Sequence, residues 1–285
     1  MKQGRIKNII TGALCFLLPA VVILIAFIKM KMAPFGEKSL MIMDMSSQYV
    51  EFLCGLKNGD VYFSWSKALG GNYVGAFTYY VSSPFSLLTL LCPNSQMPIA
   101  VLFLTVLKIG LAGLSFSFLL RHRFERYDLS TVLFSMLYGL MSYNIAFSLS
   151  IMWLDGVIWL PIIILGIEKI LEGKKGWLLT FSLFVSFIST YYISYMIGIF
   201  TAIYFVYRCI EIKTGIKNFF KYLWKFALST IIAASWGAFL LLPTLASLFQ
   251  GRIGQVVNEY SGMFNFSLFE SKFIYKFFRG GYDSI

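Results

Sequence analysis

Long uninterrupted apolar runs constrain this chain more than any other feature of its sequence. The first run, Ile9 to Ile28, has about 20 residues, which is the length that an α-helix needs to cross a bilayer. Hydrophobic residues make up 58% of the chain and charged residues only 13%, far below the charged share of soluble domains. The sequence therefore predicts an all-α polytopic membrane protein and argues against an ordinary soluble domain.

Hydropathy averaged over windows of about 19 residues predicts seven membrane spans. The apolar stretch 177–207 would form a helix of roughly 46 Å, against a hydrocarbon core of about 30 Å. We therefore expect two short helices there, turning near Ser189 to Tyr192, as suits helices that line a protein cavity. The predicted spans form a single transmembrane domain over 1–285 and cover 9–28, 98–120, 129–149, 152–171, 177–190, 191–207 and 226–248.

Lysine and arginine concentrate in short loops between the apolar runs, and the formal net charge is +11. By the positive-inside rule we expect a cytoplasmic N-terminus, an exterior loop over 29–97 and an exterior C-terminus. The loops on both sides of 177–207 are basic, which requires an even number of crossings between them. No recognition motif accompanies the charge, so a nucleic-acid partner is not expected. The basic loop residues are Lys2, Arg5, Lys7, Arg121, Arg123, Arg126, Lys174, Lys175, Arg208, Lys213, Lys217, Lys221 and Lys225.

The metal-binding residue types are few and scattered. The four cysteines, Cys15, Cys54, Cys92 and Cys209, show no paired spacing, and His122 is the single histidine. This pattern argues against a zinc or haem site, and the thiols are expected to act as small apolar fillers.

Asp155 is one of two acidic residues with a claim to function. It lies at the predicted outer end of the fourth span, between Trp153 and Trp159. An acid at the edge of the hydrocarbon commonly faces a bundle interior or cavity and marks a functional site. The equally weighted alternative is a helix-start carboxylate that the helix dipole favours.

Asp44 is the second candidate, and it opens an amphipathic run on the exterior loop. Met45, Tyr49 and Leu53 recur at helical spacing, and the segment 57–59 ends the run, so we expect an interfacial helix. Spacing alone favours a helix N-cap role for Asp44, in which its carboxylate accepts hydrogen bonds from first-turn amides. A functional role is the alternative.

The rest of the exterior loop is rich in aromatic, small, amide and hydroxyl residues, in two segments, 65–72 and 79–85. Aromatic faces beside polar donors suit a sugar, whose C–H faces stack while its hydroxyls form hydrogen bonds. An aromatic belt at the level of the lipid headgroups is a compatible second interpretation.

Several short motifs follow one another in a fixed order through essentially the whole chain. They are Pro34-Phe35-Gly36, Asp44-x-x-x-Gln48-Tyr49, Gly70-Gly71-Asn72, Tyr79-Tyr80-x-x-x-Pro84-Phe85, Trp153-Leu-Asp155 with Pro161, Thr190-Tyr191-Tyr192-Ile-Ser194-Tyr195 and Gly281-Tyr-Asp283-Ser-Ile285. As an ordered set, these motifs resemble the YfhO family of bacterial membrane proteins. That family is similar to the GT-C class of polytopic glycosyltransferases, so the resemblance implies a GT-C-like helical bundle.

The resemblance implies transfer of a sugar from a polyprenyl-phosphate carrier to an exterior cell-wall polymer, such as teichoic or lipoteichoic acid, at the outer face of a bacterial cell membrane. It implies Asp44 and Asp155 as catalytic acids. Independently of the resemblance, carboxylates and water suit an optional Mg²⁺ or Mn²⁺ between these two residues, and no cofactor is certain. Lys67, Arg252 or Lys272 would pair the leaving phosphate. The implied substrate-binding residues are Gln48, Tyr49, Asn72, Tyr79, Tyr80, Tyr191 and Tyr192.

Two other functions stay open. A transporter or lipid flippase would carry polar residues at mid-membrane on several spans, whereas Lys108 is the only charge near the middle of a predicted span and its side chain can snorkel to the interface. Members of the family are also much longer, so we expect the chain to be the N-terminal part of a longer protein. A truncated, non-catalytic fragment is therefore the third interpretation.

Overall fold

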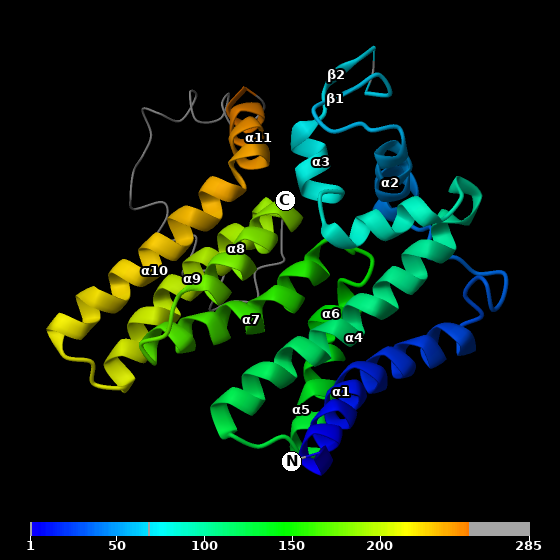
Figure 1. Cartoon of the computed structure of the whole chain (residues 1–285). Helices are drawn as coiled ribbons and strands as arrows, with labels where there is room; N and C mark the ends of the chain where they lie inside the picture. The colour runs from blue at the N-terminus through cyan, green and yellow to red at the C-terminus, as the bar shows by residue number, and fades with distance from the viewer. Residues whose placement is uncertain (1, 68, 251–285) are drawn as a thin grey trace, which may run out of the picture. The chain divides into compact units, whose positions relative to one another are not determined.

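The computed structural model describes residues 2–67 and 69–250, and in these residues the fold is almost entirely helical (Figure 1). Contacts divide the chain into Met1–Thr244 and Leu245–Ile285, and the first unit is described here by itself. The all-α polytopic membrane architecture predicted from the sequence is confirmed.

The helices α4 (Met97–Phe124) and α7 (Trp153–Leu171) form the centre of the first unit. α1 (Lys2–Lys29) packs along α4, and α4 packs in turn on α7 (Figure 1). Gly113 permits the close approach of α1 and α4, because a Cβ atom there would lie 2.5 Å from the Cys15 carbonyl oxygen. The absence of a side chain at this position therefore sets how closely the two helices pack.

The predicted span 129–149 forms two helices, α5 (Leu129–Gly139) and α6 (Ser142–Ala146). The Asn144 side chain bridges the break, because its Nδ2 donates to the carbonyl oxygens of Tyr138 at 3.0 Å and Gly139 at 2.9 Å. Carbonyls at a helix end lose their usual intrahelical partners, and the Tyr138 carbonyl otherwise accepts a long bond of 3.5 Å from the Met141 amide. One buried amide thus adds two hydrogen bonds where the helix ends.

The stretch 177–207 contains a break at the position that the sequence predicted. α8 (Trp177–Ser189) ends before Thr190, whose backbone is extended, and α9 (Tyr191–Glu211) begins directly after it. The Ser194 hydroxyl lies 2.7 Å from the Ser186 hydroxyl and donates to the Ser186 carbonyl oxygen at 2.6 Å. Short polar contacts therefore tie the two helices together beside the break.

The last predicted span, 226–248, differs most from the observed helices. α10 (Ile216–Trp236) begins ten residues earlier than predicted, and α11 (Ala238–Gln250) follows after a bend of 79° at Gly237. The early start places three lysines on the first turns of α10. Charged residues lower the windowed hydropathy, so the predicted span begins only after them. The bend follows a glycine, which weakens a helix locally.

The number of spans stays a prediction, although the membrane-spanning character is clear. Four helices in the described residues are long and apolar enough to cross a bilayer, and up to six if each bent helix pair forms one span. The orientation and the count of seven are expectations from the loop charges.

The loop 29–97 folds into short elements at the end of the bundle where α4 begins. The predicted amphipathic helix is present, with its first turn as the π-helix η1 (Met45–Tyr49), which continues into α2 (Val50–Lys57). Gly59 follows with a left-handed φ of 78°. The remaining elements are β1 (Phe63–Ser64), antiparallel to β2 (Gly71–Asn72), then α3 (Val74–Tyr80), η2 (Pro84–Leu91) and η3 (Asn94–Gln96).

Two apolar cores meet along α7. One core joins the loop elements to α1 and α4 and includes Met45, Leu53 and Leu154. The other joins α7 to α8, α9 and α10 through residues such as Ile167 and Phe205. Because α7 contributes to both cores, its first turn lies beside the folded loop 29–97.

Candidate functional site

Five tyrosines from three separate segments gather at the end of the bundle that carries the folded loop. We call Tyr49, Tyr79, Tyr80, Tyr191 and Tyr192 the tyrosine cluster. The ring centroids of Tyr79 and Tyr80 are 4.6 Å apart, and those of Tyr49 and Tyr80 are 5.2 Å apart. Tyr79 also lies 5.9 Å from Tyr191 and 6.1 Å from Tyr192, which begin α9. The π-helix, α3 and α9 therefore share one aromatic surface.

Polar contacts fix the tyrosine cluster in place. The Tyr80 hydroxyl donates to Gln48 Oε1 at 3.0 Å, and Trp153 Nε1 at the start of α7 donates to the Tyr79 hydroxyl at 3.4 Å. The structure thus brings together six of the seven residues predicted to bind substrate. Figure 1 shows how far apart in the chain the contributing segments are.

Asp44 directly precedes the π-helix, and its side chain is exposed. It accepts no capping hydrogen bond, and its backbone is already helical at φ −61° and ψ −22°, whereas an N-cap residue has an extended backbone. The capping role favoured by spacing is therefore wrong. In the part of the chain that the structure describes, the carboxylate caps no helix, and its exposed side chain lies beside Tyr49.

Asp44 acts electrostatically on the tyrosine cluster. Burial is the main cause that raises the pKa of the Tyr49 phenol, and the negative charge of nearby Asp44 raises it further. The segment between Asp44 and Tyr49 is a π-helix, a rare backbone form that is frequent at functional sites. Asp44 and the tyrosine cluster therefore belong to one candidate site.

Asp155 is placed differently from Asp44. It is fully buried in the first turn of α7, and its Oδ2 lies 2.7 Å from Lys108 Nζ of α4. Lys108 also donates to the Ile151 carbonyl oxygen at 2.9 Å and lies 5.6 Å from the centroid of the Phe85 ring. Lys108 is only 1% exposed, so its ammonium is held inside the protein by these contacts and not by solvent. The pair ties α4 to the turn of α7 that carries Trp153.

A divalent cation shared by Asp44 and Asp155 does not fit this arrangement. The Lys108 ammonium already occupies one oxygen of Asp155 and would repel a second cation. In the described residues no group of three or more histidine, cysteine, aspartate or glutamate side chains is arranged to hold a metal ion.

Asn72 lies apart from the tyrosine cluster, at the end of the β-hairpin. Its Oδ1 accepts a hydrogen bond from the Val74 amide at 3.1 Å, and its carbonyl oxygen accepts one from Lys67 Nζ at 2.5 Å. Of the three cations expected to pair a phosphate, Lys67 therefore lies beside Asn72. Arg252 and Lys272 fall outside the described residues.

A cavity of about 600 Å³, the outer pocket, adjoins the tyrosine cluster. Phe52 links the two, because its ring centroid lies 4.8 Å from that of Tyr80 and 5.8 Å from that of Tyr73. The outer pocket combines aromatic faces with carboxylates, amides, hydroxyls and one ammonium group. Its polar and aromatic lining residues are Glu51, Phe52, Asn58, Asp60, Ser64, Ser66, Lys67, Tyr73 and Asn94.

The sequence interpretation missed the acids of the outer pocket. Glu51, Gly55 and Asn58 recur at helical spacing on one face of α2 and all line the pocket. That polar face, opposite the buried Leu53, is the sequence signal from which the outer pocket could have been predicted. Asp60 is placed by the turn that follows, where its Oδ2 accepts a hydrogen bond from the Ser64 hydroxyl at 2.6 Å.

A family model described as "Bacterial membrane protein YfhO" matches residues 14–285. The chain belongs to the YfhO family. This confirms the resemblance inferred from the motifs, and it supports a multi-pass membrane protein for the YfhO-family chain. Searches of curated proteins and of solved structures each found no match.

Proposed function

We propose that this YfhO-family protein is a membrane glycosyltransferase. It transfers a sugar from a polyprenyl-phosphate carrier to an exterior cell-wall polymer such as teichoic or lipoteichoic acid. The observation that carries the proposal is the exposed, uncapped carboxylate of Asp44 beside the tyrosine cluster, which joins segments far apart in the chain. The outer pocket, which adjoins the tyrosine cluster, has the mixture of rings and hydrogen-bonding groups that sugars require.

Asp44 is the general base in this proposal. Its carboxylate accepts the proton of the acceptor hydroxyl while that oxygen attacks the anomeric carbon of the donor sugar. The bond between the anomeric carbon and the phosphate oxygen breaks, and polyprenyl phosphate leaves with the bonding electrons. Lys67, whose ammonium lines the outer pocket, is suited to balance the charge of the departing phosphate.

The remaining predicted residues bind and position. The tyrosine cluster and Gln48 offer stacking faces and hydroxyl or amide contacts to the sugar, and Asn72 orients Lys67 through its carbonyl oxygen. Asp155 is a positioning residue, because Lys108 holds it inside the bundle beneath Trp153. The loop charges support an exterior location for the site.

The test uses cells that produce wild-type protein or Asp44→Asn, with Glu37→Gln as a matched control on the same loop. Mass analysis of cell-wall polymers should detect the added sugar with wild type and with Glu37→Gln, and lose it with Asp44→Asn. Protein level and membrane insertion should be equal in all three strains. Unchanged polymers in Asp44→Asn cells would reject the proposal.

A transporter or lipid flippase is the second candidate, because the buried Lys108–Asp155 pair is the kind of intramembrane charge that transport proteins use. Vesicles that contain the purified protein separate the two functions. A glycosyltransferase consumes the sugar-lipid only when an acceptor is present, whereas a flippase moves it without one.

A further inference from the structure

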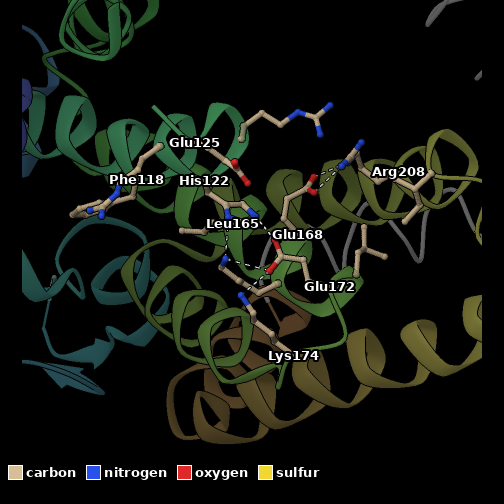
Figure 2. A pocket seen from close by; sticks show the side chains of 13 residues that line it. Phe118, His122, Glu125, Leu165, Glu168, Glu172, Lys174 and Arg208 are labelled. Atoms are coloured by element: carbon tan, nitrogen blue, oxygen red, sulfur yellow. Dashed lines mark hydrogen bonds and ion pairs between the residues drawn. The ribbon is translucent and has the colours of Figure 1, made fainter. Parts of the chain in front are cut away.

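A cavity of about 830 Å³ opens at the opposite end of the bundle, where α4, α7 and α9 finish. We call it the basic-end pocket. Figure 2 shows side chains from these three helices surrounding it. The candidate sugar-transfer site lies near the start of α4, so the basic-end pocket is separate from it.

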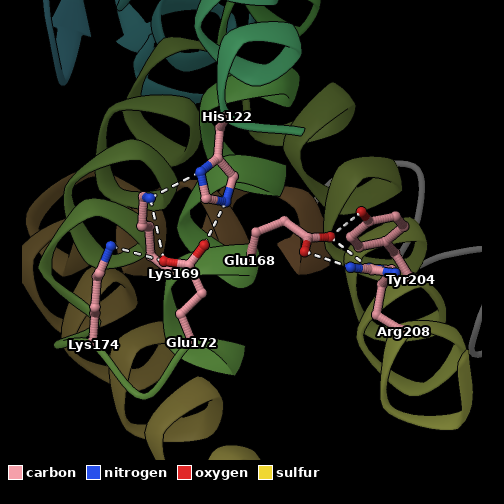
Figure 3. A network of polar contacts seen from close by, with 7 residues as sticks. All are labelled: His122, Glu168, Lys169, Glu172, Lys174, Tyr204 and Arg208. Atoms are coloured by element: carbon pink, nitrogen blue, oxygen red, sulfur yellow. Dashed lines mark hydrogen bonds and ion pairs between the residues drawn. The ribbon is translucent and has the colours of Figure 1, made fainter. Parts of the chain in front are cut away.

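One ion pair closes a side of the basic-end pocket. Arg208 donates two hydrogen bonds to the Glu168 carboxylate, from Nε to Oε1 at 2.6 Å and from Nη2 to Oε2 at 2.8 Å. The Tyr204 hydroxyl adds a third, to Glu168 Oε1 at 2.5 Å. Both charged groups are buried and satisfied, so this pair is a structural clamp between α7 and α9 (Figure 3).

A second carboxylate sits among three basic side chains. The Glu172 carboxylate lies 2.8 Å from His122 Nε2, 2.8 Å from Lys174 Nζ and 3.3 Å from Lys169 Nζ. Lys169 also lies 2.9 Å from His122 Nδ1, which orients the imidazole (Figure 3). The donors are therefore already arranged around an anionic group, and that carboxylate is 38% exposed and lines the pocket.

Basic side chains outnumber carboxylates in the lining of the basic-end pocket. Five of its lining side chains are arginine or lysine and three are glutamate. Arg121 packs 5.1 Å from the centroid of the Tyr127 ring, and among residues 2–67 and 69–250 no carboxylate lies within ion-pair distance of it. Lys174 is 60% exposed, which leaves two of its three ammonium donors available.

The same pocket has an apolar wall. Phe118, Leu165 and Ile212 line it, and Phe118 and Ile212 are 42% and 43% exposed. A ligand with a charged head and an apolar body would satisfy both surfaces. Basic pockets between transmembrane helices at the cytoplasmic side typically bind anionic lipid headgroups.

We propose that the basic-end pocket binds a phosphate ester. In the membrane, this ligand is the headgroup of an anionic phospholipid. Arg121 and Lys174 bind the phosphate oxygens beside the donors that surround Glu172. The acyl chains run along Phe118 and Ile212. The competing explanation is purely structural, since cations at helix C-termini are stabilised by the helix dipoles without any ligand.

The experiment uses the full chain in three preparations. These are nanodiscs of phosphatidylcholine alone, nanodiscs that also contain phosphatidylglycerol, and phosphatidylcholine nanodiscs with inorganic phosphate in the buffer. The variant Arg121→Gln/Lys174→Gln is compared with Lys217→Gln/Lys221→Gln, which removes equal charge from exposed sites on α10. Thermal midpoints and the phosphatidylglycerol retained in native mass spectrometry are measured.

Phosphatidylglycerol should stabilise the wild type and the α10 control, and bind about thirtyfold more weakly to the pocket variant. If inorganic phosphate alone reproduces this pattern, the site is confirmed and its ligand is a soluble phosphate ester. If neither probe stabilises the wild type, or if the pocket variant and the control respond alike, the proposal is overturned.

A second variant distinguishes loss of the binding site from misfolding, because it is expected to bind the lipid more tightly than the wild type does. Glu172→Gln removes the internal carboxylate and frees the donors of His122, Lys169 and Lys174 for the ligand. Retention of phosphatidylglycerol should therefore rise above that of the wild type. Weaker retention in a folded Glu172→Gln protein would contradict the proposed site.

Discussion

The Tyr80 hydroxyl lies 3.0 Å from Gln48 Oε1, and this hydrogen bond joins α3 to the π-helix that begins after Asp44. The contact links two motifs that are 32 residues apart in the chain. It holds the ring of Tyr80 against Tyr49 and Phe52, where the tyrosine cluster meets the outer pocket.

Tyr80→Phe removes this hydrogen bond and keeps the ring. A hydrogen bond of this kind contributes about 1 kcal/mol, so kcat/KM for sugar transfer should fall about fivefold. Tyr207→Phe is the control, since Tyr207 lies towards the far end of α9 and is 57% exposed. Equal rates for wild type and Tyr80→Phe would show that the contact does not order the site.

The buried Lys108–Asp155 pair should behave as a structural unit. Asp155→Asn leaves the Lys108 ammonium without its counter-ion inside the bundle, at a cost of about 3–5 kcal/mol in the free energy of unfolding. The double variant Lys108→Met/Asp155→Leu removes both charges and should recover most of that loss. Unfolding in detergent measures the free energies, and a double variant less stable than either single one would contradict this account.

The Arg208–Glu168 clamp depends on the planar guanidinium. In Arg208→Lys a single ammonium cannot make both hydrogen bonds to the carboxylate, so we expect a loss of about 2 kcal/mol in unfolding free energy. Arg123→Lys is the matched control, because its contact with Glu211 is exposed and 3.3 Å long. It should change stability by less than about 0.5 kcal/mol. Equal losses in both variants would argue against the clamp.

Acid should weaken the network around Glu172. Burial raises the pKa of the Glu172 carboxyl, but hydrogen bonds from Lys174 and Lys169 outweigh it, and the pKa falls below its ordinary value of 4.5. Because the folded-state pKa is lowered, the stabilisation is complete above the unfolded-state pKa and is lost as the pH falls through the folded-state value. Thermal midpoints of the wild type should therefore drop more steeply in acid than those of Glu172→Gln. Parallel curves would show that Glu172 does not contribute.

Local sequence signals located several helix boundaries. The polar tip around Thr190 divides an apolar stretch that is too long for one span, and α8 ends and α9 begins on either side of it. The amphipathic run after Asp44 predicted the helix that ends at Lys57. These features depend on residues close together in the chain, which is why they could be predicted.

Pairings between distant helices were not accessible in this way. Lys108 and Asp155 are 47 residues apart, and their contact depends on how α4 and α7 pack and in which register. The capping role that spacing favours for Asp44 is wrong, because spacing cannot tell a capping carboxylate from one on a helix whose first backbone dihedrals are already helical. The acids of the outer pocket come from a helix face and a turn that only the folded loop brings together.

The most direct test of the central claim is sugar transfer by the purified protein from a polyprenyl-phosphate sugar to an exterior polymer acceptor. General-base catalysis contributes about 10²–10⁴-fold, so Asp44→Asn should lose activity by at least a hundredfold, while Glu37→Gln keeps the wild-type rate. An Asp44→Asn rate within a few fold of the wild type would contradict the role assigned to Asp44 and the glycosyltransferase site built around it.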